Sequence, residues 1–241
     1  MIKLTDEQKA YIGAPIDQHV YLNACPGSGK TEVVGAMVAR VVEEWTRFPS
    51  GIAVLTFSNS ATDELKNRLV RYLGEPLGFP HLVSTFDSFV YSRMVASIAS
   101  EVTEFPGKDG DSRIRILENK ADIFHTRKKI CGRSVSACKY NYDLETKGFT
   151  FSTGERTRDK QLNDAPITNV ALEDLINTKK RFWAAGFATY KDVDMIALAA
   201  LKRPSLKSYF QRLAKRFPLV IVDECQDLSA EQLAIDRKSV V

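Results

Sequence analysis

The chain has 241 residues, of which 44% are hydrophobic and 27% charged, and its formal net charge is +4. This composition is typical of one large soluble domain, or of one domain with an insertion, and it excludes a chain too small to bury a core. No apolar run approaches the length of a membrane span and the N-terminus has no apolar signal core, so we expect a cytoplasmic protein with no membrane partner.

The first predicted element is a helix, and a strand, a glycine-containing loop and a second helix follow it. Thr5 and the acidic residues after it are typical of a capped helix start. Residues 19–24 predict a short strand, and residues 25–29 form a loop with two glycines. Apolar residues then recur at helical spacing from Val33 to Val42, which predicts a helix directly after the loop.

The next elements repeat this alternation. Residues 52–57 are a continuous apolar run, as expected for a strand that is covered on both faces. A turn at 58–61 and a helix containing Leu65, Leu69 and Leu73 follow. Residues 82–85 predict a third strand, and residues 87–98 a further helix.

Residues 218–223 predict a fourth buried strand, and the alternation as a whole predicts an α/β fold with a RecA-like, right-handed parallel sheet. Residues 100–205 differ, because they hold polar loops and helical patterns at 112–131, 170–184 and 190–201. We therefore predict a RecA-like domain from residues 1–95 and 206–241, interrupted by a mostly helical insertion at 96–205.

The strongest chemical motif lies between the first strand and its helix. Backbone N–H groups of such a loop, together with the helix N-terminus, bind phosphate oxygens. Lys30 is expected to contact the β- and γ-phosphates of ATP, and Thr31 to hold Mg²⁺. The alternative is an ordinary turn. The predicted nucleotide-binding residues are Ala24, Cys25, Pro26, Gly27, Ser28, Gly29, Lys30 and Thr31.

The second motif follows the fourth strand, where Asp223 and Glu224 lie at the carboxyl edge of the sheet. Asp223 is expected to reach the Mg²⁺, and Glu224 to orient and deprotonate the attacking water. Asp-Glu after a strand also occurs in plain surface turns. Combined with the phosphate loop, however, the pair indicates a nucleotide hydrolase.

Five segments, in order, resemble the motifs of UvrD/Rep-like superfamily 1 DNA helicases. The Asp-Glu-Cys-Gln-Asp sequence at 223–227 resembles their DExQD motif, and residues 24–31 resemble their AGAGSGKT loop. Residues 4–8 resemble their Q motif, residues 54–61 their LTFTNKAA motif, and residues 84–89 their GTFHSF motif. The resemblance implies that Gln8 binds the adenine edge and that Gln226 belongs with Lys30 and Glu224 to the catalytic residues.

The resemblance also implies contacts with single-stranded DNA from Thr56, Phe57, Asn59, Thr85 and Ser88. Phe57 is the best candidate for stacking on a base, which suits a motor that ignores sequence. The alternatives are a core position for Phe57 and an exposed helix position for Gln8. Two departures, Ser60 for a family Lys and Asp87 for a family His, affect the expected DNA contacts and not the ATP chemistry.

The resemblance implies ATP-driven 3′-to-5′ translocation on single-stranded DNA and unwinding of tailed duplexes, with Mg²⁺ as cofactor. Two alternatives remain: a nucleotide-dependent DNA-binding module of a repair or anti-phage defence complex that does not unwind DNA, and a P-loop kinase. The kinase does not explain why the DExQD-like and LTFTNKAA-like motifs occur together. Repair or defence proteins are possible partners.

Two further features carry weaker predictions. Six Lys and Arg residues between 202 and 216, with no acidic residue, suit a polyanion or form a solvated helix face. Cys131 and Cys138 lack a second pair, so we expect free thiols and no metal site.

The end of the sequence predicts a longer natural protein. Family members continue after DExQD to a second RecA-like domain, of which nothing is seen here. Residues 236–241 do not continue the preceding helix well, and GAT CGG AAG AGC GTC GTG, which matches a sequencing-adapter sequence, can encode them. We hypothesise that the natural gene continues differently after Ile235; a truly short protein or a frameshift is the alternative.

Overall fold

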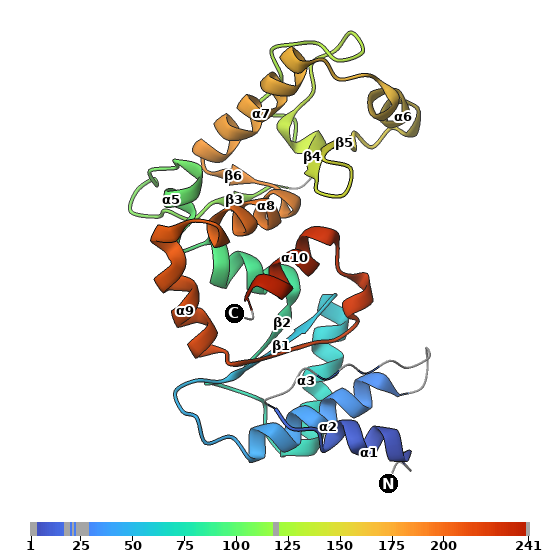
Figure 1. Cartoon of the computed structure of the whole chain (residues 1–241), viewed down its shortest axis with the longest axis vertical. Helices are drawn as coiled ribbons and strands as arrows, with labels where there is room; N and C mark the ends of the chain where they lie inside the picture. The colour runs from blue at the N-terminus through green and yellow to red at the C-terminus, as the bar shows by residue number, and fades with distance from the viewer. Residues whose placement is uncertain (1–3, 17–19, 21, 23–28, 118–120, 240–241) are drawn as a thin grey trace. The chain divides into compact units, whose positions relative to one another are not determined.

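The computed structural model describes residues 4–16, 20, 22, 29–117 and 121–239 of the chain. It divides into two compact units. The first unit combines Met1–Phe89 with Gln211–Leu228, and the second combines Val90–Phe210 with Ser229–Val241 (Figure 1). The chain thus leaves the first unit, builds most of the second, and returns, as expected for a domain with an insertion. That these units are the RecA-like domain and its insertion stays a prediction.

A parallel sheet forms the centre of the first unit. Its described strands are β1 (Ile52–Thr56), β2 (Leu82–Thr85) and β7 (Leu219–Val222), in the order β2-β1-β7. All three were predicted, β1 and β7 from their apolar runs, and both pairings are parallel. Every residue of the central strand β1 is buried, which confirms that it is covered on both faces. Most of the strand predicted at 19–24 lies outside the described residues.

Three helices belong to the same unit: α1 (Asp6–Ile12), α2 (Lys30–Glu43) and α3 (Asn59–Leu73). Thr5 caps α1 through a capping box with Gln8, which confirms the predicted helix start. Val38 of α2, Leu65 of α3 and Ile52 of β1 are fully buried in one apolar cluster. This cluster holds the starts of α2 and α3 at fixed positions beside the sheet.

The prediction of one continuous helix at 87–98 is wrong, because the segment is divided between an α-helical turn and a π-helix. The α-helical part, α4 (Phe86–Phe89), is a single turn, and Val90–Val95 continues as a π-helix before the short helix α5 (Ala99–Thr103). The backbone N–H of Ala96 donates to the carbonyl oxygen of Tyr91, five residues earlier. The wider π-helical turn is compatible with burial of Val90, Met94 and Val95. Their apolar spacing alone does not distinguish a π-helix from an α-helix.

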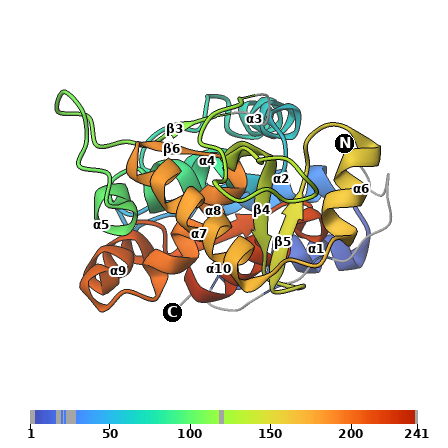
Figure 2. The same ribbon diagram turned by 90° about the horizontal axis from the view of Figure 1, so that it is seen from above.

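The second unit contains four longer helices and two small sheets. The predicted helices at 170–184 and 190–201 are confirmed as α7 (Asn169–Ala184) and α8 (Tyr190–Leu201). The other two are α6 (Arg156–Asp164) and α10 (Ala230–Ser239). Strands β4 (Tyr140–Asp143) and β5 (Gly148–Phe151) form an antiparallel hairpin, and β3 (Arg115–Ile116) pairs with β6 (Phe187–Ala188) (Figure 2).

The helix predicted at 112–131 is wrong: the described residues of this segment are strand β3, turns and irregular chain. The backbone N–H groups of Arg115 and Leu117 donate to the carbonyls of Gly186 and Ala188, at 2.8 Å each. Phe124 has a positive φ of 54°, which an α-helix does not permit. Pairing with a distant strand therefore overrides the local helical spacing.

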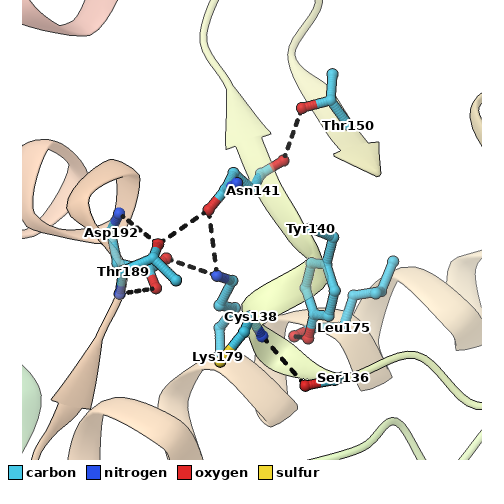
Figure 3. Close-up of polar contacts among 9 residues, drawn as sticks. All are labelled: Ser136, Cys138, Tyr140, Asn141, Thr150, Leu175, Lys179, Thr189 and Asp192. Atoms are coloured by element: carbon cyan, nitrogen blue, oxygen red, sulfur yellow. Dashed lines mark hydrogen bonds and ion pairs between the residues drawn. The ribbon is translucent and has the colours of Figure 1, made fainter. Parts of the chain in front are cut away.

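Buried polar side chains join β4, α7 and α8 inside the second unit (Figure 3). The Lys179 ammonium lies 2.7 Å from an Asp192 carboxylate oxygen, and both side chains are almost fully buried. Asn141 accepts hydrogen bonds from Lys179 and from the Thr189 hydroxyl. Burial lowers the pKa of Lys179, and the negative charge of Asp192 opposes that shift.

The helix α10 extends to Ser239, so residues 236–239 continue the preceding helix, contrary to our expectation. α9 (Lys207–Arg216) carries much of the basic stretch noted in the sequence. Two cations of this basic stretch make internal contacts: Arg203, before α9, donates to the carbonyl oxygen of Glu101, and Arg216 lies 4.5 Å from the Phe217 ring centroid. Among the described residues, no helix is both long and apolar enough to cross a membrane.

Candidate nucleotide and DNA site

The N-terminus of α2 is the first part of the candidate site. Gly29 caps this helix with a φ of +82°, a conformation that glycine adopts without the strain of a side chain. Lys30 and Thr31 follow in the first turn, where N–H groups and the helix dipole favour anions. The predicted residues Ala24, Cys25, Pro26, Gly27 and Ser28 lie outside the described residues.

The carboxyl end of β7 is the second part. The Asp223 N–H donates to the Leu55 carbonyl at 2.8 Å, so the pairing with β1 extends one residue past β7. Glu224 then adopts a left-handed conformation with a φ of 55° and begins the 3₁₀ turn Cys225–Asp227. This turn places the two carboxylates in succession at the edge of the sheet.

The two parts meet in an ion pair. Lys30 Nζ lies 2.8 Å from Glu224 Oε2, although the residues are 194 positions apart. The Gln226 amide donates to the same carboxylate oxygen. Hydrogen bonds from Lys30 and then Gln226 lower the pKa of Glu224, because both donors stabilise the charged form of its carboxylate. The three predicted catalytic residues are thus in direct contact.

Asp223 is the most buried acid of the candidate site, with 6% of its surface exposed. Burial raises its pKa, the negative charge of Glu224 raises it further, and Lys30 and Arg68 oppose these effects. A divalent cation would stabilise such a carboxylate strongly. Mg²⁺ is typically held by one or two carboxylates together with substrate phosphates, so the Asp223 carboxylate and the Thr31 hydroxyl are a suitable donor set.

A group of polar contacts between α2 and α3 was not predicted from the sequence. Arg68 of α3 forms ion pairs with Glu32 of α2 and with Glu64, and the Tyr72 hydroxyl donates to Glu32. The i,i+4 spacing of Glu64 and Arg68 could have indicated one of these pairs. Burial raises the pKa of Tyr11, and the negative charge of Asp223 adds to the shift.

The candidate DNA residues follow β1. Phe57 is 52% exposed, so it is not a core residue, and an exposed ring is able to stack on a base. Asn59, in the first turn of α3, is also exposed. The Thr56 hydroxyl is buried and bonds to Thr62 and to the Ser58 carbonyl, which stabilises the turn that carries Phe57.

Thr85 and Ser88 follow β2 in the same manner. The Thr85 hydroxyl donates to the Ser88 hydroxyl at 2.9 Å and accepts from the Ser88 N–H at 3.2 Å, as in a helix cap. Ser88 is exposed. Gln8 accepts from the Thr5 N–H at 2.9 Å in the capping box of α1, so its side chain already has one structural function.

The parallel sheet, the lysine at the start of a helix and the ion-paired acidic turn are features typical of the P-loop class of domains. Residues 4–238 match the model of the UvrD/REP helicase N-terminal domain. The chain belongs to this family, and its fold is the RecA-like α/β fold implied by the motifs.

Curated relatives agree with this assignment. DNA helicase II of Haemophilus influenzae is 24% identical over 95% of this chain and 31% of its own length. The ATP-dependent DNA helicase Rep of Buchnera aphidicola is 25% identical over 86% of this chain and 31% of its own length. UvrD1 of Mycobacterium leprae is 23% identical over 89% of the chain. The chain thus spans about a third of the length of such relatives.

Proposed function

We propose that this chain is the ATP-binding part of an ATP-dependent DNA helicase. The observation that carries the proposal is the contact between Lys30, Glu224 and Gln226, which joins the GKT and DExQD-like motifs into one site. Names of the relatives, which are DNA helicases described as ATP-dependent in several cases, support the choice of substrate.

The residues have distinct proposed functions. When ATP enters, the triphosphate competes with Glu224 for the Lys30 ammonium, which moves to the β- and γ-phosphates. Thr31 and Asp223 would hold Mg²⁺, which would supply positive charge beside the phosphates. Glu224, released from its ion pair, accepts the proton of the attacking water, and Gln226 keeps its carboxylate oriented.

On the DNA side, Phe57 is proposed to stack on a base, and Asn59, Thr85 and Ser88 to bind the phosphate backbone of a single strand. Gln8 is proposed to bind the adenine edge. The direction of movement, 3′ to 5′, and the use of tailed duplexes follow from family resemblance. Partners in repair or defence, and a cytoplasmic location, belong to the same proposal.

The proposal is tested by ATP hydrolysis with and without single-stranded DNA, measured on the longest form of the protein that contains these 241 residues. A helicase hydrolyses ATP faster when single-stranded DNA is present and displaces a strand from a tailed duplex. Stimulated hydrolysis without displacement would favour a DNA-binding ATPase module instead. An ATP hydrolysis rate that is the same with and without single-stranded DNA would contradict the proposal.

A further inference from the structure

A second charged site lies within the second unit and contains no residue of the motifs described above. A pocket of about 330 Å³ is lined by side chains from residues 122–125, from residues 134–139, and from residues 153–158, which lead into α6. Its lining is mostly polar: Asp122, His125, Ser134, Val135, Ser136, Lys139, Thr153 and Arg158.

Two side chains of the lining, Lys139 and Arg158, are permanently positive and half-buried. Neither forms a hydrogen bond or ion pair within the described part of the chain, although the charge of Arg158 acts on the neighbouring Asp159 carboxylate. The one lining carboxylate, Asp122, lies 3.0 Å from His125 Nε2. An added anion would stabilise half-buried cations that form no ion pair, so this pocket is electrostatically suited to one.

The walls of the pocket are held in place by backbone pairing. The Thr126 N–H donates to the Val135 carbonyl at 2.9 Å, and the Ser152 N–H donates to the Lys139 carbonyl at 2.8 Å. The Ser136 hydroxyl donates to the Ile123 carbonyl at 2.8 Å. The next strand, β4, is anchored by the buried Asn141 and Lys179 contact shown in Figure 3. A cation on such a fixed wall loses little conformational freedom on binding.

The rim adds further positive charge. Residues 125–139 contain five Lys or Arg residues and no Asp or Glu. Arg127, Lys128, Lys129 and Arg133 are all exposed in the loop between Thr126 and Val135, whose backbones pair. The Lys128 N–H donates to the Asp174 carboxylate, so one acid lies beside this loop. A clustered basic segment beside a cationic pocket is the electrostatic footprint of a nucleic-acid backbone contact.

We propose that this pocket binds a phosphate group of a nucleic-acid backbone, with Lys139 and Arg158 as its ligands. The choice of nucleic acid rests on the proposed function. Free inorganic phosphate shares the same chemistry, and the test separates the two sources.

The test compares Lys139→Ala and Arg158→Ala with Lys160→Ala in the 241-residue chain. Lys160 is an exposed cation of the same helix α6 that does not line the pocket, and it lies about 200° around the helix from Arg158. Affinity for a labelled oligothymidylate is measured by fluorescence anisotropy over a salt series. Lys139→Gln and thermal unfolding keep the comparison valid if the alanine variant folds poorly.

We expect each pocket variant to weaken binding and to reduce the log–log salt slope by about 0.7, the value for one lost phosphate contact on a single strand. Lys160→Ala should change both quantities much less. Pocket variants that behave like Lys160→Ala would overturn the nucleic-acid assignment.

A second arm titrates inorganic phosphate and follows the NMR resonances of the His125 ring, which lines the pocket. Shifts in the wild type that disappear in the Lys139→Ala/Arg158→Ala variant support the phosphate site. Such shifts together with unchanged DNA binding would mean a free-phosphate site and overturn the nucleic-acid source. If the wild type binds no oligonucleotide at all, the DNA part of the proposed function fails, while this arm still decides whether the pocket binds phosphate.

Discussion

At the scale of single residues, the ion pair between Lys30 and Glu224 is the central feature of the site. Each side chain satisfies the charge of the other while no triphosphate is bound, at an Nζ–Oε2 distance of 2.8 Å. In the proposed mechanism, Lys30 binds phosphate and Glu224 accepts a proton from water. If that mechanism holds, nucleotide binding and release of the Glu224 carboxylate are coupled through this one hydrogen bond.

Glu224→Gln is expected to retain ATP binding and to lose turnover, because the amide keeps the shape and can still accept from Lys30 but cannot take a proton. Loss of a general base typically costs about 100- to 10,000-fold in rate. Nucleotide binding and single-turnover hydrolysis would be measured on the longest form of the protein. Glu75→Gln, at an exposed carboxylate of the same unit, is the control. Wild-type turnover in Glu224→Gln would remove this residue from the mechanism.

Phe57→Ala is expected to weaken binding of single-stranded DNA by about 1–3 kcal/mol for each base that stacks on the ring. The effect should be the same for different base sequences, since every base presents a π-face. Anisotropy titrations with oligonucleotides of different composition measure it. Phe79→Ala serves as control, because Phe79 is also exposed but lies in a loop outside the motifs. Equal losses for both variants would show that the stacking assignment is wrong.

At the scale of elements, the second unit depends on the buried Lys179–Asp192 pair that joins α7 to α8. Lys179→Met is expected to destabilise the protein by about 3–5 kcal/mol, because it leaves Asp192 buried without its counter-charge. Adding Asp192→Asn should restore part of the lost stability. The double variant should therefore lose less free energy of unfolding than the sum of the two single variants.

Chemical denaturation of these variants measures the free energy of unfolding. Lys180→Ala, at the exposed neighbouring position on α7, is expected to change it by less than about 0.5 kcal/mol. A Lys179→Met protein as stable as Lys180→Ala would mean that the pair contributes nothing to the fold.

The elements also show how far sequence reasoning extends. β1 and β7 were predictable because each is a continuous apolar run. The hairpin β4–β5 was not predicted: Tyr140 and Tyr142, like Phe149 and Phe151, alternate with other residues as in a strand, but each strand is only four residues long. Residues 112–131 were misassigned because pairing of Arg115 and Leu117 with a distant strand is invisible locally.

The same limit applies to the site. The identities of Lys30, Thr31, Asp223 and Glu224 follow from local motifs, but their contact depends on the strand order β2-β1-β7, which the sequence does not state. The Arg68 and Glu32 pair likewise joins two helices that pack only in the folded unit. Motifs therefore predict the chemistry of a position, and tertiary structure decides which positions meet.

At the scale of the whole molecule, the 241-residue chain is expected to bind Mg²⁺-ATP without unwinding DNA. Unwinding requires two lobes that grip DNA alternately, and the chain corresponds to about a third of the length of relatives such as DNA helicase II of Haemophilus influenzae. A second lobe would also supply arginines, and such residues contribute about 1,000- to 100,000-fold to the rate of phosphoryl transfer.

A strand-displacement assay with purified chain, ATP and a duplex carrying a 3′ single-stranded tail measures this. We expect no displacement above that of the Lys30→Ala chain. Catalytic displacement that disappears in Lys30→Ala would show that these 241 residues suffice for the motor.

The measurement that tests the central claim most directly is calorimetric titration of the 241-residue chain with ATP and Mg²⁺. Lys30→Ala should bind about 10- to 150-fold more weakly than the wild type, the factor for one lost charge-assisted hydrogen bond. Lys66→Ala, at an exposed lysine of α3, should match the wild type. Equal ATP affinity in the wild type and Lys30→Ala, with both proteins folded, would contradict the assignment of this site to ATP.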